Sequence, residues 1–187
     1  MENSNHSNVL IIGGGCAGIS VASRLNSLKS SLKISIIEPS DKALYQAAWT
    51  LVGAGAYNKS NTIKPMSEVM PKYVNWIKSY AEIFSPEQNL VKTSDGDYTY
   101  DYLVVCPGLK LNFNGVEGLT ESLGKNNVCT NYEADMAEYT WECLKNLKGG
   151  NLLFTEPPMP IKCAGAPQKI AYLAADHCLL YTSPSPR

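Results

Sequence analysis

The residues with the clearest capacity for chemistry lie around Cys163. Lys162 precedes this cysteine, Lys169 follows it, and the intervening Ala-Gly-Ala-Pro run predicts a turn into a helix over residues 168–175. A helix N-terminus and neighbouring cations stabilise a thiolate, which is the nucleophilic form of cysteine. We therefore expect Cys163 to be a catalytic nucleophile, with a buried structural cysteine as the alternative.

A second set of chemically informative residues is the run Gly13-x-Gly15-x-x-Gly18, which follows the apolar residues 9–12 and opens a helical pattern. In such a fingerprint the first glycine permits a tight turn, the second lets a pyrophosphate approach the backbone, and the third lets the helix pack closely. Glu38 ends the next predicted strand, about twenty residues later, where a carboxylate accepts hydrogen bonds from an adenosine ribose. The pattern predicts a dinucleotide site that disfavours NADP, whose 2′-phosphate would meet Glu38.

The choice of dinucleotide depends on a later segment. Ser94-Asp95-Gly96-Asp97 predicts a hairpin, and a buried strand, expected over residues 102–106, ends in Cys106-Pro107-Gly108. This arrangement resembles the second FAD motif of flavoproteins with two dinucleotide domains, with Gly108 at its end. It favours FAD over NAD, and we interpret Cys106 as a small buried apolar residue.

The elements that position these residues follow from hydrophobic periodicity. Residues 9–38 form a β-α-β unit, and residues 45–57 are ambiguous between loop and helix. The remaining predicted elements are a helix over 65–70, a strand over 74–84, a helix over 134–147 that places Cys143 in the core, and a strand over 151–155. The fold class is α/β: a Rossmann-like FAD-binding domain with a parallel sheet, helices and a β-hairpin, followed by the start of a second Rossmann-like domain.

The second domain is expected to lack a nucleotide cradle. Where a second glycine fingerprint would follow the strand over 151–155, the chain has Pro157, Pro158 and Pro160 and no glycine until Gly165. Prolines cannot present the backbone N–H groups of a phosphate cradle. We therefore predict that NAD(P)H is not the electron donor.

Composition narrows the function classes further. The net charge of −1 comes without any block of Lys or Arg, which excludes a nucleic-acid footprint, and the six cysteines lack the spacing of a zinc site, so no metal is expected. No apolar run approaches the ~20 residues that span a bilayer, and residues 1–8 are too short and polar for a signal peptide.

Residues 178–187 resemble the translation of a sequencing-library adapter and are expected to be non-native, with a genuine Ser/Pro linker as the alternative. The expected division is 1–112 as the FAD-binding domain, 113–177 as the connection and truncated second domain, and 178–187 as the tail.

Three stretches carry a family resemblance: the fingerprint with Glu38-Pro39, the run YQAAWTLVGAG over 45–55, and KCAGAPQK over 162–169. Together they make residues 9–177 resemble the sulfide:quinone oxidoreductases of the mitochondrial-like type. The resemblance implies that FAD lies along five residues: Cys16, Ala17, Glu38, Gln46 and Ala81. Ala47 departs from the proline that the family often has after this glutamine.

The resemblance also implies a reaction. Cys163 and a second cysteine beyond this chain would bridge over the flavin, hydrogen sulfide would attack to form a persulfide, and electrons would reach ubiquinone through FAD. Glutathione or sulfite would accept the sulfane sulfur. The missing C-terminal part would bind the membrane surface, so the location would be peripheral, on a bacterial cell membrane or the mitochondrial inner membrane. Cys129 resembles an additional active-site cysteine of some bacterial members.

Three alternative interpretations stay open. A type II NADH:quinone oxidoreductase shares the first FAD domain but needs a second glycine cradle. Flavocytochrome c sulfide dehydrogenase has similar cysteine chemistry but usually carries a secretion signal. The third alternative is an inactive FAD-binding fragment or regulatory module.

Overall fold

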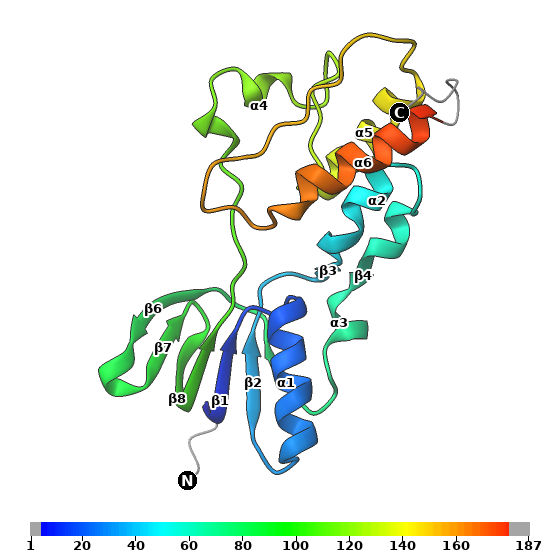
Figure 1. The fold of residues 1–187 in the computed structure, drawn as a ribbon. Helices are drawn as coiled ribbons and strands as arrows, with labels where there is room; N and C mark the ends of the chain where they lie inside the picture. The colour runs from blue at the N-terminus through cyan, green and yellow to red at the C-terminus, as the bar shows by residue number, and fades with distance from the viewer. Residues whose placement is uncertain (1–4, 180–187) are drawn as a thin grey trace. The chain divides into compact units, whose positions relative to one another are not determined.

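The computed structural model describes residues 5–179 of the 187-residue chain, and the chain divides into two compact units (Figure 1). The first unit comprises residues 1–43 and 64–108, and the second comprises residues 44–63 and 109–187. The tail expected over 178–187 lies outside the described residues apart from Cys178 and Leu179. Among the described residues, no helix is both long and apolar enough to cross a bilayer.

The first unit is built on a six-stranded sheet with the order β5-β2-β1-β8-β7-β6. β5, β2, β1 and β8 run parallel, whereas β7 pairs antiparallel with both β8 and β6. The strands are β1 (His6–Ile12), β2 (Ile34–Ile37), β5 (Asn75–Ile77), β6 (Ala81–Ser85), β7 (Leu90–Thr93) and β8 (Gly96–Val105). The helix α1 (Cys16–Leu28) connects β1 to β2 and lies along them (Figure 1). The predicted β-α-β unit and the predicted hairpin are therefore confirmed.

The central strand β1 is buried on both faces of this sheet. Val9 and Ile11 pack in a cluster with Ala22 of α1, and partly buried residues of α1 complete this side. Leu10 and Ile12 pack in a second cluster that includes Val91 of β7. Burial on both faces is expected of a parallel strand in an α/β fold, and it explains why β1 is a continuous apolar run.

Two strand predictions in this unit are wrong. The strand expected over 74–84 is divided into β5 and β6, because these strands occupy opposite edges of the sheet and the chain must turn between them. Ser79 N donates to Ile77 O at 3.0 Å in that turn. The strand over 102–106 does form the end of β8, but it is not the buried strand we expected: Tyr102 is 72% exposed and Val105 is 56% exposed.

The second unit is mostly helical. Its longer helices are α5 (Ala134–Lys145) and α6 (Gly165–Leu179), and the shorter elements are η1 (Gln46–Ala48), α2 (Trp49–Gly53), η2 (Lys59–Thr62), η4 (Phe113–Gly115) and α4 (Leu119–Ser122). The chain passes between the units through the paired short strands β3 (Lys42–Leu44) and β4 (Ile63–Pro65), and the first unit also contains α3 (Met66–Val69) and η3 (Pro86–Gln88). Trp49 and Val52 of α2 pack with Ala137 of α5. The ambiguous segment 45–57 is therefore largely helical.

The strand expected over residues 151–155 is absent, which corrects the prediction that a second sheet begins there. The segment has no regular structure, and Leu153 is 88% exposed. A strand is stabilised by hydrogen bonds to a neighbouring strand, and none pairs with this segment within the described part of the chain.

Candidate functional site

The first candidate site is the turn between β1 and α1, which lies within the first unit. Gly13 has a φ of +100°, and a Cβ at this position would collide with the carbonyl oxygen of Cys106. A Cβ on Gly18 would collide in turn with the carbonyl oxygen of Gly13. Both positions therefore need glycine for the close packing of the turn, whereas Gly15 has nothing within 4 Å of its Cβ position. The space above Gly15 is open.

The N-terminus of α1 faces this open space. Gly15 is the N-cap residue and offers no side-chain hydrogen bond, and the first turn of the helix contains no acidic residue. The first backbone N–H groups of a helix have no partner within it, and they carry the positive end of its dipole. Cys16 and Ala17 are exposed here, so this arrangement fits the pyrophosphate of a dinucleotide.

Glu38 is held beside the same turn. Its Oε2 accepts a hydrogen bond from Gly14 N at 2.7 Å, and its Oε1 accepts one from Ser40 N at 2.8 Å. The backbone is fixed as well, because Trp76 Nε1 donates to Glu38 O at 2.8 Å. A carboxylate accepts about four hydrogen bonds, so capacity remains for two ribose hydroxyls.

The remaining expected FAD contacts in this unit lie on β6 and after β8. Ala81 begins β6 and packs against the cluster that includes Ile37 and Ile77. Gly108 has a φ of +77° and nothing within 4 Å of its Cβ position. Cys106 packs against the core, and burial raises the pKa of its thiol, so it stays protonated at neutral pH. This supports our structural interpretation of Cys106.

A second candidate site is a cavity of about 100 Å³ within the second unit, lined by Cys163. The structure brings Gln46, a residue expected to contact the cofactor, and Cys163 to this same cavity. Its other lining residues come from η1, α2, the loops before α5 and α6, and the start of α6: Ala47, Thr50, Asn131, Tyr132, Lys162, Ala166 and Lys169.

Two polar atoms of this cavity lack partners. Thr50 is only 4% exposed, and neither its Oγ1 nor Asn131 Oδ1 has a hydrogen-bond partner among the described residues. Buried polar groups in native proteins are almost always satisfied, so these two point to a bound group. Among the described residues that line the cavity, two are lysines and none is a carboxylate, which favours a small anion.

Cys163 itself is positioned through its backbone. Tyr132 Oη donates to Cys163 O at 2.9 Å, and Ala166 N donates to the same oxygen at 3.2 Å. The pKa of Tyr132 is raised, first by burial and then by the nearby Cys163 and Glu156. The phenol therefore keeps its proton and remains a donor at neutral pH.

Cys129 has different surroundings. The residues that line the cavity, as far as the chain is described, do not include it. Its Sγ lies 3.5 Å from the Sγ of Cys143, which is half-buried on α5. Burial and, secondly, the hydrogen bond to Cys143 raise the pKa of Cys129 to about 12. At neutral pH it is a thiol, which favours an association with Cys143 over a nucleophilic role.

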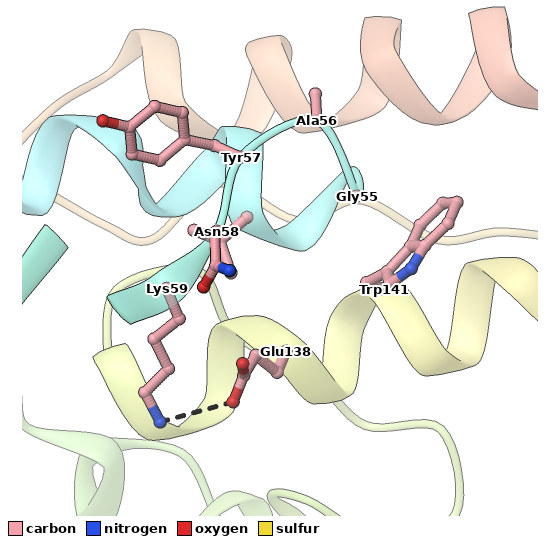
Figure 2. Close-up of a pocket in the computed structure, with 8 residues that line it drawn as sticks. Gly55, Ala56, Tyr57, Asn58, Lys59, Glu138 and Trp141 are labelled. Carbon is pink, nitrogen blue, oxygen red and sulfur yellow. Dashed lines mark ion pairs between the residues drawn. The ribbon is translucent and has the colours of Figure 1, made fainter. Parts of the chain in front are cut away.

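A larger open cavity of about 390 Å³ lies elsewhere in the second unit (Figure 2). It is lined by residues of α2 and α5 and of the loop between α2 and η2, among them Lys59 and Trp141. Lys59 Nζ already pairs with Asp135 at 2.8 Å and with Glu138 at 3.5 Å. Because the charge of Lys59 is already balanced, we assign this cavity no chemistry.

Sequence reasoning missed three residues of the Cys163 cavity: Thr50, Asn131 and Tyr132. Thr50 belongs to the 45–55 run that carries the family resemblance, so the sequence could have indicated that it lies at the site. Asn131 and Tyr132 are thirty or more residues from Cys163 in the chain, and no periodicity connects segments that meet only through tertiary packing.

Comparison with known proteins gives a consistent result. The pyridine nucleotide-disulphide oxidoreductase family matches residues 7–140. The mitochondrial sulfide:quinone oxidoreductase of Dictyostelium discoideum is 46% identical over 176 residues, covering 92% of this chain and 39% of that protein. The mitochondrial sulfide:quinone oxidoreductase of Mus musculus is 40% identical over 171 residues, covering 91% of this chain and 38% of that protein.

A solved structure supports the same relationship. The X-ray structure of the sulfide:quinone oxidoreductase from the hyperthermophilic bacterium Aquifex aeolicus matches with a TM-score of 0.68 at 27% identity. The match covers 95% of this chain and 41% of that chain, which confirms the α/β fold. The chain therefore spans about two fifths of the length of these relatives.

Proposed function

Because this chain belongs to the pyridine nucleotide-disulphide oxidoreductase family, whose members are FAD-dependent, we propose that it is the FAD-binding part of a sulfide:quinone oxidoreductase. The observation that carries the proposal is the cavity in which Cys163 meets two lysines and two unsatisfied polar side chains. The similarity to relatives named sulfide:quinone oxidoreductase supports the choice of substrates. In this proposal the substrates are hydrogen sulfide and ubiquinone.

The first unit holds the cofactor in this proposal. The open N-terminus of α1, with Gly15, Cys16 and Ala17, receives the pyrophosphate, and Glu38 binds the ribose. Gln46, Ala81 and Gly108 are further contacts, carried over from the family resemblance. When bound, FAD supplies the two-electron acceptor that links sulfide oxidation to quinone reduction.

The residues of the cavity prepare Cys163 to take sulfur from the substrate. Lys162 and Lys169 line the cavity beside Cys163 and attract hydrosulfide, which is an anion. Thr50 Oγ1 can donate a hydrogen bond to the sulfur of hydrosulfide, Asn131 Oδ1 can accept one from its S–H group, and Tyr132 fixes the backbone of Cys163. Hydrosulfide would attack the disulfide that Cys163 forms with the second cysteine of the full-length protein: its sulfur bonds to Cys163 as a persulfide, and the bond to the second cysteine breaks. The second cysteine leaves as a thiolate, and FAD, when bound, would accept the two electrons.

The location and the sulfur acceptor follow from the substrates. Ubiquinone is dissolved in the membrane, so we place the whole protein peripherally on a bacterial cell membrane or the mitochondrial inner membrane. A small sulfur nucleophile such as glutathione or sulfite removes the sulfane sulfur from Cys163. The NADH-dependent alternative is less favoured, because prolines follow the position where a second cradle would begin.

The test uses full-length protein loaded with FAD and compares wild type with Cys163→Ser. Anaerobic addition of sulfide should bleach the flavin absorbance and give a long-wavelength charge-transfer band in wild type, and both changes should be lost in the variant. Cys106→Ser, at the cysteine that packs against the core of the first unit, is the matched control and should behave as wild type. Unchanged bleaching in Cys163→Ser, or bleaching by NADH in place of sulfide, would contradict the proposal.

A further inference from the structure

The segment before α5 is held against that helix by a tight turn. Lys125 and Val128 form an antiparallel bridge, and Asn126 and Asn127 between them have φ values of 50° and 62°. Asparagine tolerates this left-handed region better than most residues. The turn ends at Val128, so Cys129 follows it directly.

One face of α5 receives the turn. Met136, Tyr139 and Cys143 are three and four residues apart, which places them on one side of a helix. The Sδ of Met136 would lie 3.2 Å from a Cβ at Gly124, and Tyr139 Oη accepts a hydrogen bond from Asn127 N at 3.1 Å. Both ends of the turn are therefore anchored, and the anchoring determines where Cys129 lies.

The third contact along this face joins two sulfur atoms. Cys129 Sγ donates to Cys143 Sγ at 3.5 Å, although the residues are 14 positions apart in the chain. Both side chains are half-buried, and neither takes part in a disulfide. A disulfide has an S–S distance of about 2.05 Å, so closure needs an approach of about 1.5 Å.

We propose that Cys129 and Cys143 are a redox-active thiol pair that closes to an intramolecular disulfide when it meets a small disulfide such as oxidised glutathione. Cys143, as thiolate, attacks one sulfur of the oxidant, whose S–S bond breaks and whose other half leaves as a thiol. The second cysteine then attacks the mixed disulfide and releases the other half as a thiol. Two protein S–H bonds are lost, one S–S bond forms, and the oxidant takes both protons and both electrons.

The cross-link would act on the segment that leads to the Cys163 cavity. Asn131 and Tyr132, which line that cavity, follow Cys129 by two and three residues. A bond from Cys129 to α5 fixes the start of this segment. The pair is thus a modification site in its own right, and its existence does not depend on sulfide being the substrate.

The experiment treats full-length protein with oxidised glutathione and maps its peptides without reduction. The expected product is a linked pair of peptides that carry Cys129 and Cys143 and have lost two hydrogen atoms, reversible by dithiothreitol. Cys143→Ser should give no such product, and the control Cys106→Ser should give it undiminished. A mixed disulfide at Cys129 that never resolves, or a link from Cys129 to Cys163, would overturn the proposal.

Hydrogen exchange on wild-type protein provides a second measurement that needs no variant. Amides of residues 124–132 should exchange more slowly after oxidation, on the order of tenfold, because the cross-link suppresses local opening. Equal exchange in oxidised and reduced protein would show that this segment is not tied to α5 by the pair.

Discussion

At the scale of single residues, the glycines of the cradle serve two different purposes. Gly13 is needed by the fold, since its φ of +100° and its approach to Cys106 leave no room for a side chain. Gly15 has an ordinary φ of −73° and open space above it. In the proposed function this open space receives a phosphate of FAD, so we expect Gly15 to serve the ligand and not the fold.

Alanine substitutions should separate these purposes. Gly13→Ala should lower the free energy of unfolding by about 1–3 kcal/mol through backbone strain and collision, and should lose FAD as a consequence. Gly15→Ala should leave thermal stability unchanged while FAD binding falls, because its methyl group occupies the space for the phosphate. Thermal unfolding and the flavin absorbance of the purified proteins measure both quantities. Equal losses of stability in the two variants would contradict this assignment.

Two buried threonines offer a similar contrast. Thr62 is satisfied, because its hydroxyl donates to Lys59 O at 2.7 Å and accepts from Trp49 Nε1 at 3.3 Å. Thr50 has no such partner. Removing a satisfied buried hydroxyl costs about 1 kcal/mol or more, whereas removing an unsatisfied one is neutral or stabilising.

We therefore expect Thr62→Val to destabilise the protein and Thr50→Val not to. In full-length enzyme, Thr50→Val should raise the KM for sulfide, because the hydroxyl is kept for the substrate. Urea unfolding and steady-state kinetics provide the two readouts. A destabilised Thr50→Val with unchanged KM would mean that its hydroxyl has a structural role.

The raised pKa of Cys129 predicts a pH dependence. An unfolded thiol titrates near 9.0 and the folded one at about 12, so at pH 9 about half of the unfolded thiols but about one in a thousand folded ones are thiolates. Alkylation of Cys129 at that pH should be far slower in folded protein than in urea. Because the folded pKa is raised, the linked stability is fully present below pH 9 and is lost as pH rises toward 12.

The measurement follows alkylation of the Cys129 peptide and urea midpoints between about pH 8 and about pH 11. Cys129→Ser should remove the part of the loss of stability at high pH that comes from Cys129, so the urea midpoint of this variant should fall less steeply as pH rises. A folded-state alkylation rate at pH 9 equal to that in urea would show that the thiol is neither buried nor paired with Cys143.

At the scale of elements, sequence motifs and periodicity predicted the elements whose conformation is determined by residues close together in the chain. The glycine run, the β-α-β unit, the hairpin and α5 all follow from residues adjacent in the chain. The prediction of a strand over 151–155 is wrong because a strand needs a partner. The segment has the apolar residues of a strand, but in the described part of the chain no neighbouring strand pairs with it. The division of 74–84 into β5 and β6 had the same cause, because strand partners decide which edge of a sheet each segment joins.

Leucine substitutions test this distinction. Leu10 in β1 is fully buried, whereas Leu153 in the absent strand is 88% exposed. Leu10→Ala should lower the free energy of unfolding by about 2–5 kcal/mol, and Leu153→Ala should change it by less than about 0.5 kcal/mol. Urea denaturation measures both. A large effect at Leu153 would indicate that residues 151–155 pack in the folded protein after all.

At the scale of the whole molecule, the chain carries two candidate sites, and sequence motifs predicted each of them separately. The motifs did not predict which residues gather around the Cys163 cavity. The cradle and Cys163 were each identified from short motifs, and the resemblance to sulfide:quinone oxidoreductases is confirmed by the relatives. The presence of Gln46, Thr50, Asn131 and Cys163 around one cavity depends on how α2, α5 and α6 pack. That packing rests on contacts between distant segments, which composition and periodicity do not encode.

The central claim is that Cys163 takes sulfur from sulfide, and mass spectrometry of full-length, FAD-loaded protein tests it most directly. After one anaerobic turnover with sulfide, with no sulfur acceptor present, alkylated peptides should show one added sulfur atom on the Cys163 peptide and none on the Cys129 peptide. Added sulfur on Cys129 with none on Cys163, or no added sulfur on either while the flavin is reduced, would contradict the account.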